Sequence, residues 1–432
     1  MKDFFKHTQH ILTRWQSWLI GSIIIALLLW LALITDETGI TDKTYWDLLQ
    51  LIVWAMLPVT LMWGAYWLNK QEREAEQAEV RRQTEIERNR DSEQLQETEW
   101  QRYLNEMTRL LEKGLDGINP DPDLQNIAKI QTLATLRRLN GTRKGLLVQF
   151  LMDARLITAG SKQNIGLQGA DLSQADLRGA KLSRTDLSGV DLSEADLSLT
   201  DLHRTNLNEA NLSKAILKGA KLGDTNLQQA NLQQSDLRMA KMAGAKLFRA
   251  TLDGANLSGA ELHWARLDEA GLSGANFNGS SMRDIRLRKA KLNGAKLSEA
   301  ILNRADLREA DLSGATLTGA KLLDANLTGA KLVEADLRWA SLTGAKLNNS
   351  NLTRADLSEA ELRRVDLRQA NLNWTNLEEV NLSDAELRGV DLSNARLLEA
   401  ILDGAKYHDK TKWPKSFNKS KTKAVFKAND PW

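Results

Sequence analysis

The chain has 432 residues, with 58 Lys and Arg against 56 Asp and Glu, and it contains no cysteine. The missing cysteines exclude disulfides, thiolate metal sites and a cysteine nucleophile. The net charge of +2 provides no whole-protein field that would attract nucleic acid. Tryptophan is frequent, at 13 residues, and clusters near the N-terminus, which is typical of a membrane interface.

Two apolar runs predict a membrane anchor over residues 1–68. Residues 18–34 form the first run and residues 51–68 the second, and each is long enough to cross the hydrocarbon layer of a bilayer. Because the second run has an amphipathic lead-in, the expected transmembrane helices span about 18–34 and 47–68 and form an α-helical hairpin. For the first run, a cleaved signal peptide is the alternative.

The charges that flank these runs predict their orientation. The connection between the runs is acidic, whereas basic residues flank the outer ends: Lys2, Lys6, Arg14, Lys70, Arg73, Arg81 and Arg82. By the positive-inside rule, both termini and everything after residue 68 are expected in the cytoplasm, at a plasma membrane or an internal photosynthetic membrane. Asp47 and Gln50 suit solvated helix ends near the outer interface, with a pore lining as the alternative.

A charged helical linker is expected over residues 69–118, where Glu, Arg and Gln are dense. Its last part carries apolar residues at the coiled-coil spacing of four and three: Trp100, Leu104, Met107 and Leu111. This pattern lasts barely two heptads, so two interpretations stay open. Either two chains associate here, giving a homo-oligomer, or the apolar stripe packs against the helices that follow.

Two short helices are expected in residues 119–164. Asp123 is expected to cap the first helix, whose apolar face comprises Leu124, Ile127, Ile130 or Ala134, and Leu136. The second helix is expected over about 142–157, with this buried set: Leu146, Leu147, Phe150, Leu151 and Leu156. Both helices are expected to form the N-terminal cap of the repeats that follow. Arg143 and Lys144 are expected to be solvated charges, with phosphate binding as the alternative.

A leucine recurs at every fifth residue from Leu167 to Leu402, replaced only at Met242, Phe277 and Met282, and a small residue, usually alanine, commonly lies two positions before it. An α-helix or a straight strand would scatter such a column over several faces, so the chain must turn once per repeat. Stacked repeats then form a solenoid over residues 165–406. Its core column begins with Leu167, Leu172, Leu177, Leu182, Leu187 and Leu192. A repacked or slightly bent coil is expected where bulkier residues enter the inward positions: Phe277, Met282 and Ile285.

The units A-D-L-S-Q at Ala170, A-D-L-R-G at Ala175 and A-N-L-S-G at Ala255 resemble the A(D/N)LXX unit of the pentapeptide repeat family. This resemblance implies a mainly β fold, a right-handed quadrilateral β-helix with four repeats per coil. The stretch LNGTRKGLLVQFLMDARLI is similar to a segment that precedes the repeats in membrane-bound members, and TKWPKSF is similar to the tails of related proteins.

Residues 407–432 leave the repeat register and are rich in lysine. Trp413, Pro414 and Phe417 are expected to fold over the last coil as its C-terminal cap. The lysines suit a solvated, mobile tail, with contact to anionic lipid or nucleic acid as the alternative.

The sequence offers no catalytic, cofactor or metal site. His203 and His263 are isolated, and neither a phosphate loop nor a nucleophile with its base is evident. Trp264, Trp339 and Trp374 are the candidate exposed contacts. With four repeats per coil these tryptophans fall on three different sides, which argues against a single aromatic stripe.

These expectations combine into a non-enzymatic, membrane-anchored scaffold that presents a cytoplasmic rod to a protein partner. The expected partners are a lipid bilayer and a cytoplasmic protein, and nucleic acid is not expected. Two alternatives stay open. Some pentapeptide repeat proteins mimic DNA and act on topoisomerases through an acidic rod surface, although acids and bases nearly cancel here. An accessory subunit of a channel or transporter would require the two spans to oligomerise.

Overall fold

The computed structural model describes residues 43–117, 119–158, 164–415, 417 and 423–426, and for residues 43–53, 55–57 and 60 it describes the backbone only. The chain divides into two compact units, Met1–Asp91 and Ser92–Trp432. The expected span at 18–34 lies outside the described residues.

Helix α2 (Lys43–Glu112) is continuous over 70 residues and contains Pro58. Its first part holds the second apolar run and its middle part is the charged linker, so the helix continues from one into the other without a break. Within the residues that the structure describes, no helix combines the length and apolarity that a bilayer crossing requires.

The end of α2 packs against two shorter helices, α3 (Pro122–Leu136) and α4 (Gly141–Asp153). Tyr103 of α2 hydrogen-bonds Thr132 of α3 at 3.0 Å, and its ring meets Phe150 of α4 edge-on. Met107 is fully buried in the same core. Trp100, Met107 and Leu111 of the stripe at coiled-coil spacing therefore pack within the chain, whereas association of two chains here stays a prediction.

Helix α3 differs from its expected form in both its cap and its buried face. The cap is Asp121, whose carboxylate accepts a hydrogen bond from the Asp123 backbone N–H at 2.9 Å. Pro122 follows at the helix start, where a missing N–H costs nothing. The buried set is Ala128, Thr132 and Leu136, and the two small residues among them permit close approach of the neighbouring helices. The isoleucines expected inside are exposed: Ile127 and Ile130.

Helix α4 is shorter than expected and begins with an Asn140 cap whose side chain accepts from the Arg143 N–H. Leu147 and Leu151 are fully buried, as expected, whereas Leu146 is exposed. Leu156 is also buried, but it lies beyond the helix end.

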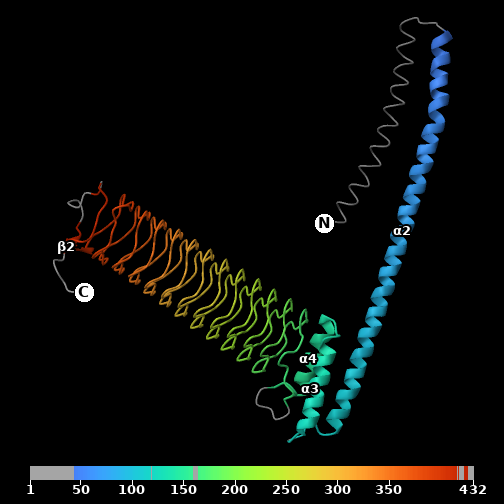
Figure 1. Ribbon diagram of the computed structural model, residues 1–432, viewed down its shortest axis with the longest axis horizontal. Coiled ribbons are helices and arrows are strands. Elements are labelled where there is room, and N and C mark those ends of the chain that lie inside the picture. Colours follow the sequence, from blue (N-terminus) through green and yellow to red (C-terminus); the bar gives the residue numbers. More distant parts are fainter. Residues whose placement is uncertain (1–42, 118, 159–163, 416, 418–422, 427–432) are drawn as a thin grey trace. The chain divides into compact units, whose positions relative to one another are not determined.

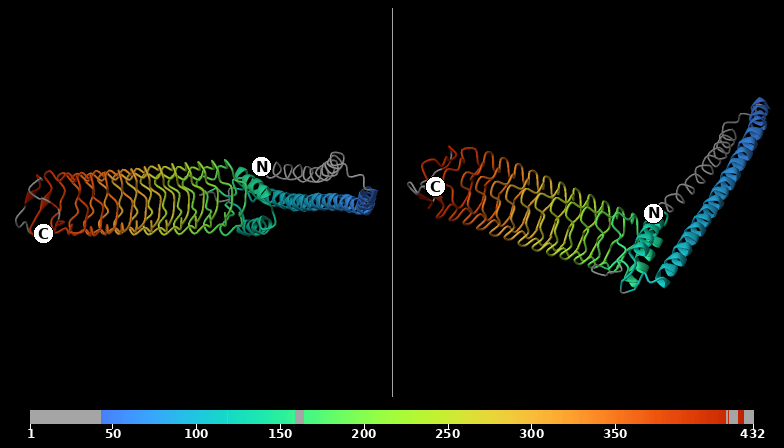
Figure 2. Two further views of the ribbon diagram at one scale, coloured as in Figure 1. Left: turned by 90° about the horizontal axis from the view of Figure 1, so that it is seen from above. Right: turned by 60° about the horizontal axis from the view of Figure 1, so that its bottom comes forward.

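The repeats form a solenoid whose coils stack regularly from α4 to β1 (Lys406–Tyr407), as Figures 1 and 2 show. Parallel bridges join residues twenty apart, beginning with Asp171 to Asp191, so four five-residue repeats make one coil. The expected leucine column is buried throughout, as are most of the alanines two positions earlier. Backbone N–H groups at leucine positions donate to the next coil, as from Leu172 to Asp191 at 2.7 Å.

Each five-residue repeat ends in a turn. At its fifth position, which is the second residue after the leucine, the backbone adopts a positive φ. Glycine meets this demand without strain, as at Gly189 with φ of 63°. Many other residue types also hold the conformation there, including Trp264 at 59°. The bulky inward residues Phe277, Met282 and Ile285 are fully buried, and the bridges continue across their coils. The coil is thus repacked at this point without a break in the ladders.

The C-terminal end is covered by residues that follow the last repeat. Strand β1 pairs in parallel with β2 (Val425–Phe426). Tyr407 meets the Trp413 ring edge-on at 5.5 Å, and Phe417 stacks on Trp413 at 4.9 Å. These aromatic side chains pack against the solenoid core.

Candidate functional site

The outward residue that precedes each leucine is bridged to its counterpart in the next coil, so each side of the solenoid carries a ladder of polar side chains. One ladder, here called ladder L, includes a cationic run of three members: Lys246, Arg266 and Arg286. We call this run the basic run. Its neighbours along ladder L are amides before it and Asp306 after it, as in Asn226 to Lys246 and Arg286 to Asp306.

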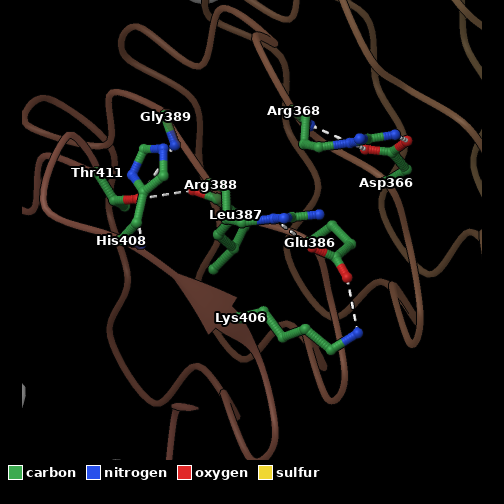
Figure 3. Close-up of polar contacts among 9 residues, drawn as sticks. All are labelled: Asp366, Arg368, Glu386, Leu387, Arg388, Gly389, Lys406, His408 and Thr411. Atoms are coloured by element: carbon green, nitrogen blue, oxygen red, sulfur yellow. Dashed lines mark hydrogen bonds and ion pairs between the residues drawn. The ribbon is translucent and has the colours of Figure 1, made fainter. Parts of the chain in front are cut away.

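In the C-terminal part of ladder L, both stacked carboxylates form ion pairs (Figure 3). Asp366 binds Arg368 at 2.7 Å, and Glu386 binds both Arg388 at 3.0 Å and Lys406 at 2.7 Å. Burial favours the neutral form of Asp366, but hydrogen bonds from Arg368 outweigh it and hold the pKa of that carboxyl below its usual value. Two stacked carboxylates are thus each neutralised by a neighbouring cation.

The same close-up shows how the last coil satisfies its backbone (Figure 3). Thr411 is buried, and its hydroxyl donates to the Leu387 carbonyl at 2.9 Å. That hydroxyl also accepts from the backbone N–H groups of Gly389 and His408, each at 3.3 Å. One threonine therefore closes the edge of the coil, which is a structural role.

Only one end of the basic run has its positive charge paired with a carboxylate. Lys246 and Arg266 are exposed and have no ion-pair partner among the described residues. Arg286 binds the Asp268 carboxylate at 3.0 Å, and the same carboxylate binds Arg288 at 2.8 Å. Asp268 is only 7% exposed, so it holds two guanidinium groups side by side from a buried position.

The three candidate tryptophans are exposed, at 65% for Trp264, 53% for Trp339 and 65% for Trp374. They occupy three different corners of the solenoid, as the twenty-residue coil requires, and no two of them are brought together. Arg338 lies over the Trp339 ring at 5.3 Å. Trp264 is two residues before Arg266, which places an aromatic side chain at the corner beside the basic run.

Neither isolated histidine gains a metal-ligand set. His263 shares a hydrogen bond with the Ser281 hydroxyl at 3.2 Å, and its ring lies near that of Trp264. Across the described ranges, no group of three His, Cys, Asp or Glu side chains is arranged to hold a metal ion.

The two cations at the start of α4 are structural, which corrects the expectation of solvated charges. Arg143 binds Glu93 at 3.2 Å and Glu97 at 3.1 Å, both on α2. Lys144 is buried and binds Asp171 of the first coil at 2.8 Å. Both side chains are engaged by carboxylates, so the phosphate-binding alternative has no free cation to use at these two positions.

Reasoning from the sequence missed the basic run, although a signal for it exists. A step of twenty from Lys246 leads to Arg266 and then to Arg286. The sharing of Asp268 by two arginines is harder to predict from the sequence. Asp268 and Arg288 are twenty residues apart at the corner position that follows the leucine, but side chains at such positions need not meet.

Together the fold and this face define a β-solenoid repeat protein with polar ladders on its sides. The pattern described as "Pentapeptide repeats" matches eight stretches within residues 167–406, several of which overlap, and together they cover more than half of the chain. The chain belongs to the pentapeptide repeat family, whose members fold as right-handed β-helices. The matched stretches are 167–204, 191–234, 245–284, 285–322, 320–358, 335–373, 347–384 and 370–406.

Several solved structures resemble the chain. HetL of the cyanobacterium Nostoc sp. strain PCC 7120, a pentapeptide repeat protein involved in heterocyst differentiation regulation, is 35% identical. The match covers 56% of this chain and 90% of HetL, with a TM-score of 0.21. A pentapeptide repeat protein of the Arabidopsis thaliana thylakoid lumen is 36% identical over 22% of this chain and 66% of its own, with a TM-score of 0.21.

QnrB1, a plasmid-mediated fluoroquinolone resistance protein, is 21% identical over 43% of this chain and 83% of its own, with a TM-score of 0.27. A comparison with curated proteins found no significant match.

Proposed function

We propose that the protein is a non-enzymatic scaffold, attached to a membrane through its N-terminal segment, whose β-helix offers its side faces to a protein partner in the cytoplasm. The observation that carries the scaffold role is the contrast between the two sets of repeat positions. Inward positions are almost uniformly leucine and alanine, whereas the outward ladders vary from coil to coil on one rigid backbone. Such a surface can present a specific pattern of charge without any cleft.

The exposed apolar surface of α2 supports membrane attachment. Leu61, Met62 and Trp63 are 66%, 68% and 64% exposed. Successive helical residues point about 100° apart, so these side chains cover different faces of the helix. Apolar surface on several faces of one helix is expensive in water and is stabilised in lipid.

Membrane attachment is tested on the full chain by alkaline carbonate extraction of native membranes. Replacing Val59 and Leu61, near the middle of the apolar run, with lysine is expected to release the protein, because a charge at the centre of the hydrocarbon layer costs about 2.5–3.5 kcal/mol. The matched control replaces Val80 and Ile86 with lysine as well. Both are exposed apolar residues in the charged part of the same helix. Release of the control to the same extent, or retention of the first variant, would reject the anchor.

The side of the membrane is tested by protease access. In sealed cells the repeats are expected to resist external protease and to be cleaved after permeabilisation. Cleavage in intact cells contradicts the cytoplasmic placement. The partner is identified by crosslinking in native membranes followed by mass spectrometry. Recovery of the same protein from independent membrane preparations supports the scaffold role.

The DNA-mimic alternative finds little support on this surface. Such a role needs a broadly acidic rod, whereas ladder L contains the basic run at its centre. A gyrase supercoiling assay with the purified full chain tests this alternative, and we expect no change in supercoiling. For the channel alternative, the side chains of Asp47 and Gln50 lie outside the described set.

A further inference from the structure

We propose that the basic run of Lys246, Arg266 and Arg286 is a docking surface for an acidic helical segment of a partner protein, lying along the solenoid axis with its carboxylates one turn apart. This inference rests on the proposed scaffold function and names the chemistry of the partner.

The basic run differs from the rest of the described ladders. Like charges occur in bridged pairs elsewhere, as between Lys221 and Lys241 or between Asp336 and Asp356. Within the bridged positions that the structure describes, only the basic run extends to three members of one sign. Like charges directly opposite each other on neighbouring strands are destabilising, so this run works against the stability of the solenoid.

The fold neutralises comparable pairs on the same ladder. Asp366 and Glu386 are stacked carboxylates, and both bind cations of the same face. No such compensation reaches Lys246 or Arg266 from any described residue. An external anion would supply the missing compensation.

The side chain at the C-terminal end of the basic run, Arg286, is already held in place. Asp268 is almost fully buried and holds Arg286 and Arg288 through separate oxygens. Ordering these two side chains in the free protein reduces the entropy lost when a carboxylate binds them. Two carboxylates, Asp268 and Asp306, face three guanidinium groups here, those of Arg286, Arg288 and Arg308, so this end also retains positive charge.

The spacing of the run favours a helix as the occupant. Neighbouring strands lie about 4.7–4.9 Å apart, which sets the step between cations. Helical residues three apart are separated by about 4.5 Å along the axis, and one full turn by about 5.4 Å. Same-side residues of an extended strand are separated by about 6.6 Å, so a bound strand would lose register with the cations.

The surroundings favour a narrow occupant over a broad polyanion. The cavity beside the run is lined by three acidic and three basic side chains: Asp268, Glu269, Glu309, Arg288, Lys289 and Arg308. A nucleic-acid duplex or an anionic bilayer would span this whole width, where the charges cancel and add no net attraction. A single helix needs only the line of cations, and Trp264, at the corner, can cover one of its apolar side chains.

The test measures binding of two labelled peptides to the detergent-solubilised full chain by fluorescence anisotropy. Both peptides are alanine-rich helices of the same composition. One carries its glutamates on a single face one turn apart, and the other carries them around the helix. The one-face peptide is expected to bind more tightly, and rising salt should weaken its binding.

The decisive variant changes Lys246, Arg266 and Arg286 to glutamine. It is expected to weaken the one-face peptide about tenfold. A matched control changes three exposed cations of another ladder, none of which has an ion pair among the described residues: Lys221, Lys241 and Lys321. This control should change binding less than twofold, and circular dichroism should show both variants folded.

Equal binding of the two peptides, or equal loss in the control, overturns the inference. Stronger binding of duplex DNA or of phosphatidylserine vesicles, lost in the same variant, also overturns it in favour of a general polyanion site. The peptide assay does not depend on membrane attachment. Its failure, together with successful crosslinking to a partner, would reject the docking surface and leave the scaffold function standing.

Discussion

Lys144 of α4 donates a hydrogen bond to the Asp171 carboxylate at 2.8 Å and another to the Ser173 carbonyl at 3.0 Å. The lysine is only 5% exposed, so its charge lies between the helical cap and the first coil. Burial opposes ionisation of Asp171, but the hydrogen bond from Lys144 and those from Ser173 lower the pKa of that carboxyl overall. The cap is therefore joined to the solenoid by a specific polar contact as well as by apolar packing.

Replacing Lys144 with methionine should destabilise the cap by about 1–3 kcal/mol, because it removes charged hydrogen bonds from a mostly buried site. The loss is measured by chemical denaturation followed by circular dichroism. Lys181→Met, at an exposed position, is the control and should stay within about 0.5 kcal/mol. Equal effects of the two changes would contradict a specific role for Lys144.

Gly145→Ala should separate α4 from the first coil. A Cβ at this position would overlap the backbone carbonyl oxygen of Asp176, which cannot move without disturbing the coil. We expect faster hydrogen exchange at Asp176, whose N–H donates to the Gly141 carbonyl at 2.9 Å. Leu146→Ala removes a larger but exposed side chain from the same helix and should leave that exchange unchanged.

Leu267→Ala should destabilise the solenoid by about 2–5 kcal/mol, because removal of the fully buried side chain leaves a cavity in the core. Leu323→Ala removes the same atoms from an outward position that is 39% exposed, and should cost much less. Denaturant unfolding of the two variants measures the difference. Similar losses would show that the leucine column does not carry the stability of the rod.

Acid should loosen the C-terminal cap through Asp391. Hydrogen bonds from Lys412 and Ser393 lower the pKa of this carboxyl from 3.8 to about 2. A carboxyl whose pKa is lower in the folded state adds stability above pH 4, and this stability is lost as the pH falls from about 4 to 2. Exchange of the Lys412 N–H, which donates to the Val390 carbonyl, should report this loss after correction for the intrinsic rate.

The control for this pH effect is Asp391→Asn, which cannot titrate. It should abolish the change in Lys412 protection between pH 4 and pH 2. If the asparagine variant kept the same pH dependence, another group would have to be responsible.

The helical cap shows where pattern-based prediction reached its limit. The sequence predicted two helices after Pro122, and two helices are present. It did not predict which face of α3 is buried, because Ile127 and Ile130 are the more apolar residues but Ala128 and Thr132 allow closer contact with Tyr103. Hydrophobicity ranks side chains one at a time, whereas helix packing depends on how closely two backbones can approach.

The basic run was accessible from the sequence only after the coil length was established. Lys246 and Arg266 become neighbours because one coil takes twenty residues, and that number came from the resemblance and not from the spacing of leucines. The sharing of Asp268 by Arg286 and Arg288 depends on side-chain geometry at a corner, which no repeat pattern specifies.

The five-residue period alone determined that the chain must coil, since no straight element can bury a leucine that returns every fifth residue. The period also determined which residues form the core, because side chains point alternately inward and outward along each side of a coil. The tertiary structure decided which charges meet across coils and which cations are neutralised. The contacts across coils join residues about twenty positions apart, so they exist only once the coils are stacked in register.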